Sequence, residues 1–529
     1  MDIWYSRSAL LACTALAVLY ASVPANAQDG SADDGLMVLE TIEVTGKRGG
    51  EAAGVASDTP LATQTTGEDI AKKEIGSIAD LGNTTEPGVE YLKRTDGPVI
   101  RGLSGPRVAT VIDGITIPYL ENFARSATSS LTNSDGGGSS FDFSSLSALD
   151  VLRGADSSRI GSGVLGGALV LRTLEPEDLI DGSRNCGALA RVIYDSQDKS
   201  LAGSLAIAGR AGDTSALLQG SYKRGHETRN MGTNGSYGRD RTRPDPLDFD
   251  QDNLLFKLRH DIEGGHRIGI TVERHHRDAR SDLATSWTVP AGIGAGQYIF
   301  PVDGYFGNEE TKRERLSLDY SYVAPSDHGF IKQAHARAYW QRLAKGAGAD
   351  GTQIRLGDGT RVSYLRDNEL SESALGFNGG LTAGFTTGIY DHKIHAGVDF
   401  ASIEAKIYMT FLPSSMVGGS QSDIPDVDGR RLGIFIDDEI SIADTGLALT
   451  PGLRFDWHEY QPKPSDGYSQ NPGSGIFGLP GKYSSSRFSP RLLATYDVNP
   501  QVQLFAQWSS AYRAPNINEL YLDFSNSLA

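Results

Sequence analysis

The sequence predicts a mainly β protein, in which an N-terminal α+β domain precedes an antiparallel β-barrel whose strands cross a membrane. Two observations predict the barrel. Segments of about ten residues alternate apolar and polar side chains, and the connections between these segments alternate between short and long. A third observation, an export signal at the N-terminus, is consistent with both.

The composition excludes several classes of protein. The chain has 529 residues, of which 39% are hydrophobic and 63 are glycine. After the N-terminal signal, no stretch approaches the roughly 18 to 20 apolar residues that a membrane-spanning helix needs. The net charge of −17 argues against a nucleic-acid partner, because binding to phosphates requires clustered Lys and Arg side chains.

Residues 1–27 are typical of a secretory signal peptide. Arg7 precedes an apolar run at 9–21, and Ala25-Asn26-Ala27 forms a small-residue cleavage site. Cleavage after Ala27 removes Cys13 and leaves Cys186 without a partner. We therefore expect no internal disulfide and no cysteine-based zinc site or catalysis.

Residues 28–60 are polar and rich in Gly, Ala and Asp, which predicts a flexible tether. Within it, residues 39–46 form a β-prone segment. Such a segment could add as a strand to the sheet edge of a partner protein. It could equally be the first strand of the following domain, and spacing alone does not separate the two interpretations.

Residues 61–180 have the pattern of a compact α+β domain. Capping residues at 66–69 and 77–80 predict two helix starts. Residues 108–112, 149–152 and 168–173 predict buried strands.

From 186 to 529 the sequence predicts barrel strands. Apolar side chains occupy alternate positions in 316–322, 447–457 and 501–508, so that one side of each strand would face lipid and the other water. We expect about thirteen strands, the last at 501–512. Since bacterial single-chain barrels have even strand numbers, this count predicts that the sequence stops before the barrel closes.

The connections between the strands support the barrel. Short periplasmic turns and long extracellular loops are typical of outer-membrane barrels, whereas a soluble β-sandwich has no reason to segregate loops by length. The predicted short turns are 211–213, 263–265, 325–327, 387–389, 443–445 and 499–500, and the predicted long loops are 224–251, 277–313, 343–369, 406–429 and 459–483.

Two motifs point to chemistry that their context does not support. Residues 161–166 spell G-x-G-x-x-G, but a strand follows them and no helix is available to hold a pyrophosphate. His275 and His276 would point to opposite faces of a strand, which is poor metal geometry, so we interpret them as part of a solvated loop. We predict no catalytic residues, no catalytic cofactor and no metal site. An enzymatic barrel, such as an outer-membrane phospholipase or protease, would not need so large a domain before its first strand.

Two groups of residues resemble the plug domain of TonB-dependent receptors: 100–107 with 111–114, and 149–155 with 161–167. Asp150 departs from the family, which usually has Glu there. Residues 40–45 resemble the TonB box, the segment that the TonB protein binds. The matching positions are Glu40, Thr41, Ile42, Glu43, Val44 and Thr45 in the box, and Arg101, Gly102, Asp113, Gly114, Arg153, Gly154, Gly161, Gly166 and Gly167 in the plug.

The resemblance implies a plug inside an outer-membrane barrel of about 22 strands, in contact with outer-membrane lipid. It also implies that ligand binds outside and that the TonB energy-transducing complex pairs with the box and pulls the plug open. We expect Arg101 and Arg153 to make ion pairs in the plug core or between plug and barrel, although a simple fold-stabilising role fits each equally well. The glycines should serve tight turns and close strand approaches.

Residues 511–515, with 516–521 after them, resemble the F-R-A-P box of haem and haemoglobin receptors, and related strings occur in siderophore receptors. The resemblance therefore implies haem, free or from a haem-carrying protein, or a ferric chelate as the transported ligand, with haem favoured. Between Tyr119 and Ser140, where haem receptors often carry a histidine, there is none. A non-transporting outer-membrane binding protein or adhesin is the alternative of another class. The candidate ligand-binding residues are Tyr91, Tyr119, Tyr512 and Arg513.

Overall fold

The computed structural model describes most of the chain from residue 59 onward. The predicted signal peptide, the tether and the 40–45 segment lie outside the described residues. None of the described helices is long and apolar enough to cross a membrane. The described residues are 59–121, 135–180, 184–238, 240–286, 298–299, 304–326, 329–355, 357–412, 420–499 and 501–522.

The N-terminal domain is built around a five-stranded sheet with the order β1-β6-β7-β4-β5. β4 and β7 pair in parallel, and the other neighbours pair antiparallel. A separate hairpin, β2-β3, and two helices accompany the sheet. The elements are β1 (Ala62–Thr66), α2 (Gly67–Lys72), α3 (Ile78–Thr84), β2 (Val89–Leu92), β3 (Gly97–Ile100), β4 (Val108–Ile112), β5 (Ile115–Thr116), β6 (Leu146–Arg153) and β7 (Gly167–Thr173).

Both predicted helix starts and all three predicted strands of this domain are confirmed. The Thr66 side chain accepts the backbone N–H of Asp69 over 3.1 Å, and Asp69 accepts in return, which is a reciprocal capping box. Ser77 caps α3 with a one-way bond, its hydroxyl accepting the backbone N–H of Asp80 over 3.1 Å. These caps turn the apolar side of each helix, including Leu81, toward the core.

The rest of the described chain forms one large antiparallel sheet. Thirteen strands follow each other in sequence order from β8 to β21, and the two-residue strand β13 pairs with β15 beside this path. The predicted count of about thirteen strands is therefore confirmed. The strands are β8 (Cys186–Asp195), β9 (Ser200–Ala211), β10 (Thr214–His226), β11 (Leu247–Ile262), β12 (His266–Asp282), β13 (Tyr298–Ile299), β14 (Tyr305–Val323), β15 (Ile331–Arg355), β16 (Arg361–Thr387), β17 (Tyr390–Leu412), β18 (Asp426–Ile442), β19 (Leu447–Lys463), β20 (Tyr483–Asn499) and β21 (Val502–Ser509).

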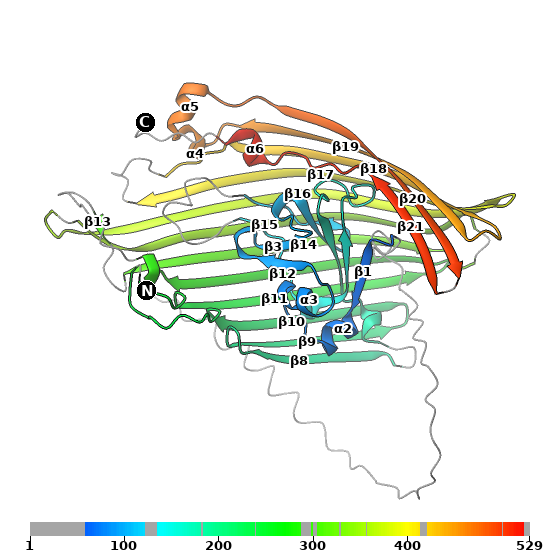
Figure 1. Ribbon diagram of the computed structural model, residues 1–529, viewed down its shortest axis with the longest axis horizontal. Helices are drawn as coiled ribbons and strands as arrows, with labels where there is room; N and C mark the ends of the chain where they lie inside the picture. The colour runs from blue at the N-terminus through cyan, green and yellow to red at the C-terminus, as the bar shows by residue number, and fades with distance from the viewer. Residues whose placement is uncertain are drawn as a thin grey trace, which may run out of the picture. The chain divides into compact units, whose positions relative to one another are not determined.

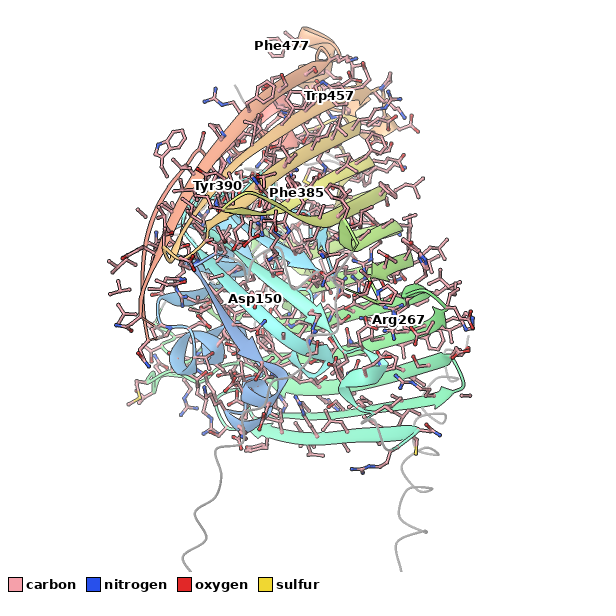
Figure 2. The ribbon with its side chains drawn as sticks, turned by 90° about the vertical axis from the view of Figure 1, so that its right-hand side faces the viewer. Asp150, Arg267, Phe385, Tyr390, Trp457 and Phe477 are labelled. Atoms are coloured by element: carbon pink, nitrogen blue, oxygen red, sulfur yellow. The ribbon has the colours of Figure 1, made fainter. Side chains whose placement is uncertain are left out.

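This sheet is apolar outside and polar inside, as the alternation predicts. On β14, Leu316 and Leu318 are 46% and 59% exposed, whereas Ser317 and Asp319 between them are 2% and 6% exposed. A soluble sheet would bury the leucines, so this inversion is what a membrane barrel with an occupied lumen requires. Figure 2 shows the occupant: the β1–β7 domain, in which Asp150 is labelled, lies against the concave face of the curved sheet.

Four of the six predicted short turns are confirmed, those at 211–213, 263–265, 387–389 and 443–445, whereas 325–327 and 499–500 each include a residue outside the described part of the chain. The longer connections gather at the opposite end of the strands (Figure 1). There, α4 (Asp466–Ser469) and α5 (Pro472–Phe477) lie between β19 and β20, and α6 (Ile517–Tyr521) follows β21 (Figure 1). Phe477, the last residue of α5, lies at the upper edge of the view in Figure 2 and is 75% exposed.

Three of the predicted long loops are wrong in extent, and the one predicted at 406–429 is shorter because β17 runs to Leu412 and β18 begins at Asp426. Residues 343–369 are almost entirely strand, because β15 and β16 continue as a hairpin joined at 356–360. The loop predicted at 277–313 is shorter, because β12 runs to Asp282 and β14 begins at Tyr305. Outside the lipid band both faces of a strand meet polar surroundings, so the apolar alternation that identifies a barrel strand is lost there.

The histidine pair and the last strand also differ from expectation. His275 and His276 lie within β12 rather than in a loop: His275 is buried, and His276 bonds Asp252 and Glu310 on neighbouring strands. The predicted strand 501–512 ends at Ser509.

Candidate functional site

The inner face of the barrel buries charged side chains that have partners on the plug. Asp113, in the turn between β4 and β5, accepts the backbone N–H of Thr173 over 2.9 Å and its hydroxyl over 2.6 Å. From the barrel, Arg315 donates to Asp113 over 2.8 Å, and the Lys257 ammonium lies 3.7 Å away. Burial opposes ionisation, but these two cations hold the pKa of Asp113 well below its usual range.

A second plug carboxylate extends this network along the barrel wall. Glu175 accepts two hydrogen bonds of 2.9 Å from Arg259 on β11 and also pairs with Lys257. Arg259 in turn donates to Asp319 on β14 over 3.2 Å, and Arg337 on β15 pairs with the same carboxylate. Because each of these linked buried charges has an opposite partner, the cost of removing it from water is offset.

Arg313 makes a further contact between the same barrel wall and the plug. Arg313 on β14 forms a two-bond pair with Glu273 on β12, with distances of 3.0 and 2.5 Å. Its third donor, Nε, reaches the backbone carbonyl of Ser140 in the plug over 2.7 Å. The plug is thus joined directly to β11 and β14 by barrel side chains that are almost fully buried, and residues of β12 and β15 pair with β14 beside them.

A cavity of about 310 Å³ separates the plug from the wall formed by β16–β19. Arg159 of the plug bridges this side, bonding Asp437 on β18 through Nε over 2.8 Å and Nη2 over 2.5 Å. Arg454 on β19 bonds Asp399 over 2.6 Å and Asp456 over 2.8 Å. Other residues that line the cavity are Tyr119, Glu121, Arg431, His458 and Arg513.

The segment after β21 lies on the plug. The backbone N–H of Tyr512 donates to the Ser157 hydroxyl, and its carbonyl accepts the N–H of Gly163, both over 3.0 Å. Ala514 bonds Ser162 over 2.8 Å. These plug bonds replace the strand pairing that the sequence predicts as far as Tyr512.

Two of the four candidate ligand-binding residues, Tyr119 and Arg513, line the cavity. The guanidinium of Arg513 forms a two-bond pair with Glu519, both distances being 2.7 Å. The hydroxyl of Tyr512 lies 3.1 Å from Nε2 of His458, which is itself a cavity residue. Tyr91 lies elsewhere, with its hydroxyl 3.1 Å from Asp96.

The two plug arginines have different surroundings. Arg153 pairs with Glu86 over 2.5 Å and donates to Thr63 over 2.6 Å, so its ion pair lies within the plug. No ion pair of Arg101 is found among the described residues, where its side chain is exposed and extends over Gly154. Its backbone φ of +52° fits a turn position rather than a core strand.

The plug glycines occupy turns and close approaches, as expected. A side chain on Gly167 would place its Cβ 2.1 Å from the carbonyl oxygen of Leu152, and one on Gly166 would approach that of Ile100 to 2.8 Å. Positive φ angles occur at Gly102, Gly114, Gly154, Gly161 and Gly167.

Sequence reasoning missed most of the charged residues at the plug–barrel junction. Their signal was present, since Glu273 with His275 and Arg313 with Arg315 alternate along β12 and β14 toward the lumen. Within the described residues, no group of three or more His, Cys, Asp and Glu side chains could hold a metal ion.

A domain seated in the lumen of a membrane-type β-barrel and held there by buried ion pairs defines a plugged barrel. A family model described as "TonB-dependent Receptor Plug Domain" matches residues 55–168, and one described as "TonB dependent receptor-like, beta-barrel" matches residues 265–528. The chain belongs to the family of TonB-dependent receptors.

Similar proteins differ in what their names say they bind. Transferrin-binding protein A of Neisseria meningitidis serogroup B is 28% identical over 206 residues, which are 36% of this chain and 21% of that protein. Hemoglobin-binding protein A of Haemophilus influenzae is 26% identical over 298 residues, which are 53% of this chain and 28% of that protein. The chain thus spans only about a quarter of the length of these relatives.

Among solved structures, the FrpB iron transporter from Neisseria meningitidis aligns with a TM-score of 0.63 at 17% identity. The alignment covers 87% of this chain and 65% of that one. At this identity the likeness establishes the fold.

Proposed function

We propose that this protein is an outer-membrane receptor for energised uptake of an iron compound. The observation that carries the proposal is the plug itself, which fills the lumen and is held by the buried Asp113–Arg315 and Glu175–Arg259 pairs. A lumen closed by bonds of this kind needs work to open, whereas a passive pore does not. In this proposal the chain catalyses no reaction.

Haem, free or taken from haemoglobin, is the favoured cargo. Two things support it: the resemblance of residues 511–521 to the F-R-A-P box, and the relative named for haemoglobin, which matches more than half of this chain. A ferric siderophore is the alternative, since related strings occur in siderophore receptors. Haem and ferric chelates enter the proposal as cargo and not as cofactors.

The proposal assigns roles to segments beyond the described residues as well. Residues 1–27 would direct export, and 28–60 would form a tether whose residues 40–45 bind TonB as an added strand. Residues 61–180 would form the plug, and the barrel from 186 onward would lie in outer-membrane lipid. The partners are the TonB energy-transducing complex and the iron compound or its carrier protein, with no role for nucleic acid.

Deletion of residues 40–45 tests the energised step. Cells that carry the deletion should bind the iron compound at their surface but lose its uptake. Deletion of residues 49–54 removes the same length of tether and should leave uptake intact. Uptake that survives the first deletion would contradict the proposal, because a passive binding protein or pore needs no TonB contact.

Haemin binding tests the cargo. The purified protein mixed with haemin should change the Soret absorption of the haem if the iron gains a protein ligand. A ferric siderophore should then fail to compete with haemin. An unchanged Soret band, with saturable siderophore binding, would exclude haem and favour the alternative.

A further inference from the structure

His458 and Tyr512 bring two metal-binding atoms together where plug and barrel meet. His458 lies on the inner face of β19 and is 3% exposed. Its Nε2 is 3.1 Å from the hydroxyl oxygen of Tyr512, and the two rings stack with centroids 5.7 Å apart. The donors come from parts of the chain 54 residues apart, so the fold, rather than local sequence, creates the pair.

Each donor has a fixed position. Strand pairing with Arg431 on one side and with Ser485 on the other fixes the backbone of His458 within the barrel wall. The backbone of Tyr512 is held on the plug through Ser157 and Gly163. A pair of donors supported in this way keeps its separation without a bound ligand.

There is room for a ligand beside the pair. His458 lines the cavity of about 310 Å³ between the plug and the β16–β19 wall. The rings of Tyr460 and Tyr483 lie 5.9 and 6.0 Å from its imidazole and form the aromatic surroundings of the donors.

We propose that Tyr512 Oη and His458 Nε2 together bind ferric iron in the cargo that this receptor takes up. The proposal rests on the proposed function and names a contact for its iron. Phenolate and imidazole are both protein ligands of iron. Two donors that bind one metal at about 2.0 to 2.1 Å and at right angles lie about 3 Å apart. Iron could therefore replace the 3.1 Å hydrogen bond that joins the two groups, with little change in their separation.

The chemistry of the step is ligand exchange. The Tyr512 phenol releases its proton to solvent, and its oxygen and the His458 nitrogen each donate an electron pair to the ferric ion. Two weaker ligands, such as water, leave the ion, and no electron is transferred. Iron remains ferric throughout.

The separation of the donors also selects the form of the iron. Adjacent donors fit a ferric ion whose chelate leaves two neighbouring positions open. Haem iron is open only above and below its ring, so it could take one donor of the pair but not both. The geometry therefore points to an incompletely chelated ferric ion, in place of the haem that the resemblance of residues 511–521 favours, as the ligand of the complete pair.

Ferric nitrilotriacetate, which leaves two adjacent positions open, is the probe. The purified full chain in detergent should develop a visible phenolate-to-iron charge-transfer band at neutral pH. Tyr512→Phe should lose the band, and His458→Gln should weaken binding at least about tenfold. Tyr390→Phe, at the turn end of β17 (Figure 2), makes the same chemical change away from the cavity and should keep the band.

The results separate this site from its alternatives. A band that persists in Tyr512→Phe would mean that iron binds another tyrosine, and no band in the unaltered protein would mean that there is no ferric site. Either result overturns the proposal. If haemin binds through Tyr512 while ferric nitrilotriacetate gives no band, the two-donor site is also overturned. None of these outcomes touches the proposed uptake function, which the deletion of residues 40–45 tests in cells.

Discussion

Arg315 on β14 donates to the carboxylate of Asp113 in the plug over 2.8 Å, and both side chains are buried. The two residues are 202 positions apart in the sequence. Lys257 on β11 approaches the same carboxylate from a second strand. One plug residue thus pairs with cations from two strands of the barrel wall, so Asp113 is one of the attachments of the plug on this side.

Asp113→Asn should loosen the plug. The amide keeps the shape of the side chain but removes one of the two counter-charges of Arg315 and of Lys257, which keep Glu273 and Glu175. Loss of hydrogen bonds to charged groups should cost about 1.5 to 3 kcal/mol. The urea concentration at which a protease begins to cleave the plug should be lower in this variant, and the free energy of plug opening follows from that midpoint. Asp250→Asn, on the outer surface of β11, should shift it by less than about 0.5 kcal/mol. Equal effects of the two variants would exclude the proposed attachment.

The contribution of Asp113 should depend on pH in a defined direction. Lys257 and Arg315 outweigh burial and lower its pKa in the folded protein, below the value of about 3.9 expected for the unfolded chain. Its stabilisation is therefore complete above about pH 4 and is lost as the pH falls through the folded-state pKa. The difference in urea midpoint between the unaltered protein and Asp113→Asn should stay constant from about pH 8 to 5 and shrink below about pH 4. A difference that already disappears at neutral pH would contradict this assignment.

Arg159 and Asp437 should act as a pair. A double-mutant cycle with Arg159→Ala and Asp437→Ala should give a coupling free energy of about 1 to 3 kcal/mol in the same assay, because the two-bond contact is nearly fully buried. Additive effects would show that the two residues stabilise the plug independently. The same cycle on the exposed pair of Lys406 and Glu404 should give a coupling within about 0.5 kcal/mol.

Gly167→Ala should disrupt the plug sheet. The added Cβ would lie 2.1 Å from the carbonyl oxygen of Leu152, and the backbone φ of +147° is unfavourable for alanine. We expect a loss of more than about 2 kcal/mol and a protease-sensitive plug. Gly203→Ala on β9 meets nothing within 4 Å and should be tolerated. Unchanged protease resistance of the plug in Gly167→Ala would show that β6 and β7 can move apart to admit the methyl group.

The membrane-facing part of the fold could be predicted because lipid imposes a strict alternation. Leu316 and Leu318 on β14 are identified from their spacing alone. Arg313 and Arg315 on the same strand are not, because a lumen-facing cation has the same pattern as a solvated one. Only the distant plug residues show that these cations are buried.

The sequence pointed to only one of the two residues of the proposed iron site, for a related reason. Tyr512 was selected by its motif, but the motif does not include His458, which lies on another strand. The strand predicted as far as Tyr512 ends at Ser509 because bonds to Ser157 and Gly163 compete with pairing to β20. The residue pattern of a single segment does not show which distant groups compete for its backbone hydrogen bonds.

Buried charge pairs and hydrogen bonds join the plug to the barrel, and this affects how the plug can be released. Such bonds are strong in a dry junction and weaken many-fold when water enters. The cavity beside β16–β19 places space for water next to the Arg159–Asp437 contact. Water that enters there would lower the force needed to break each successive ion pair between plug and barrel. The plug would then detach progressively, starting from the β16–β19 side, rather than in one step.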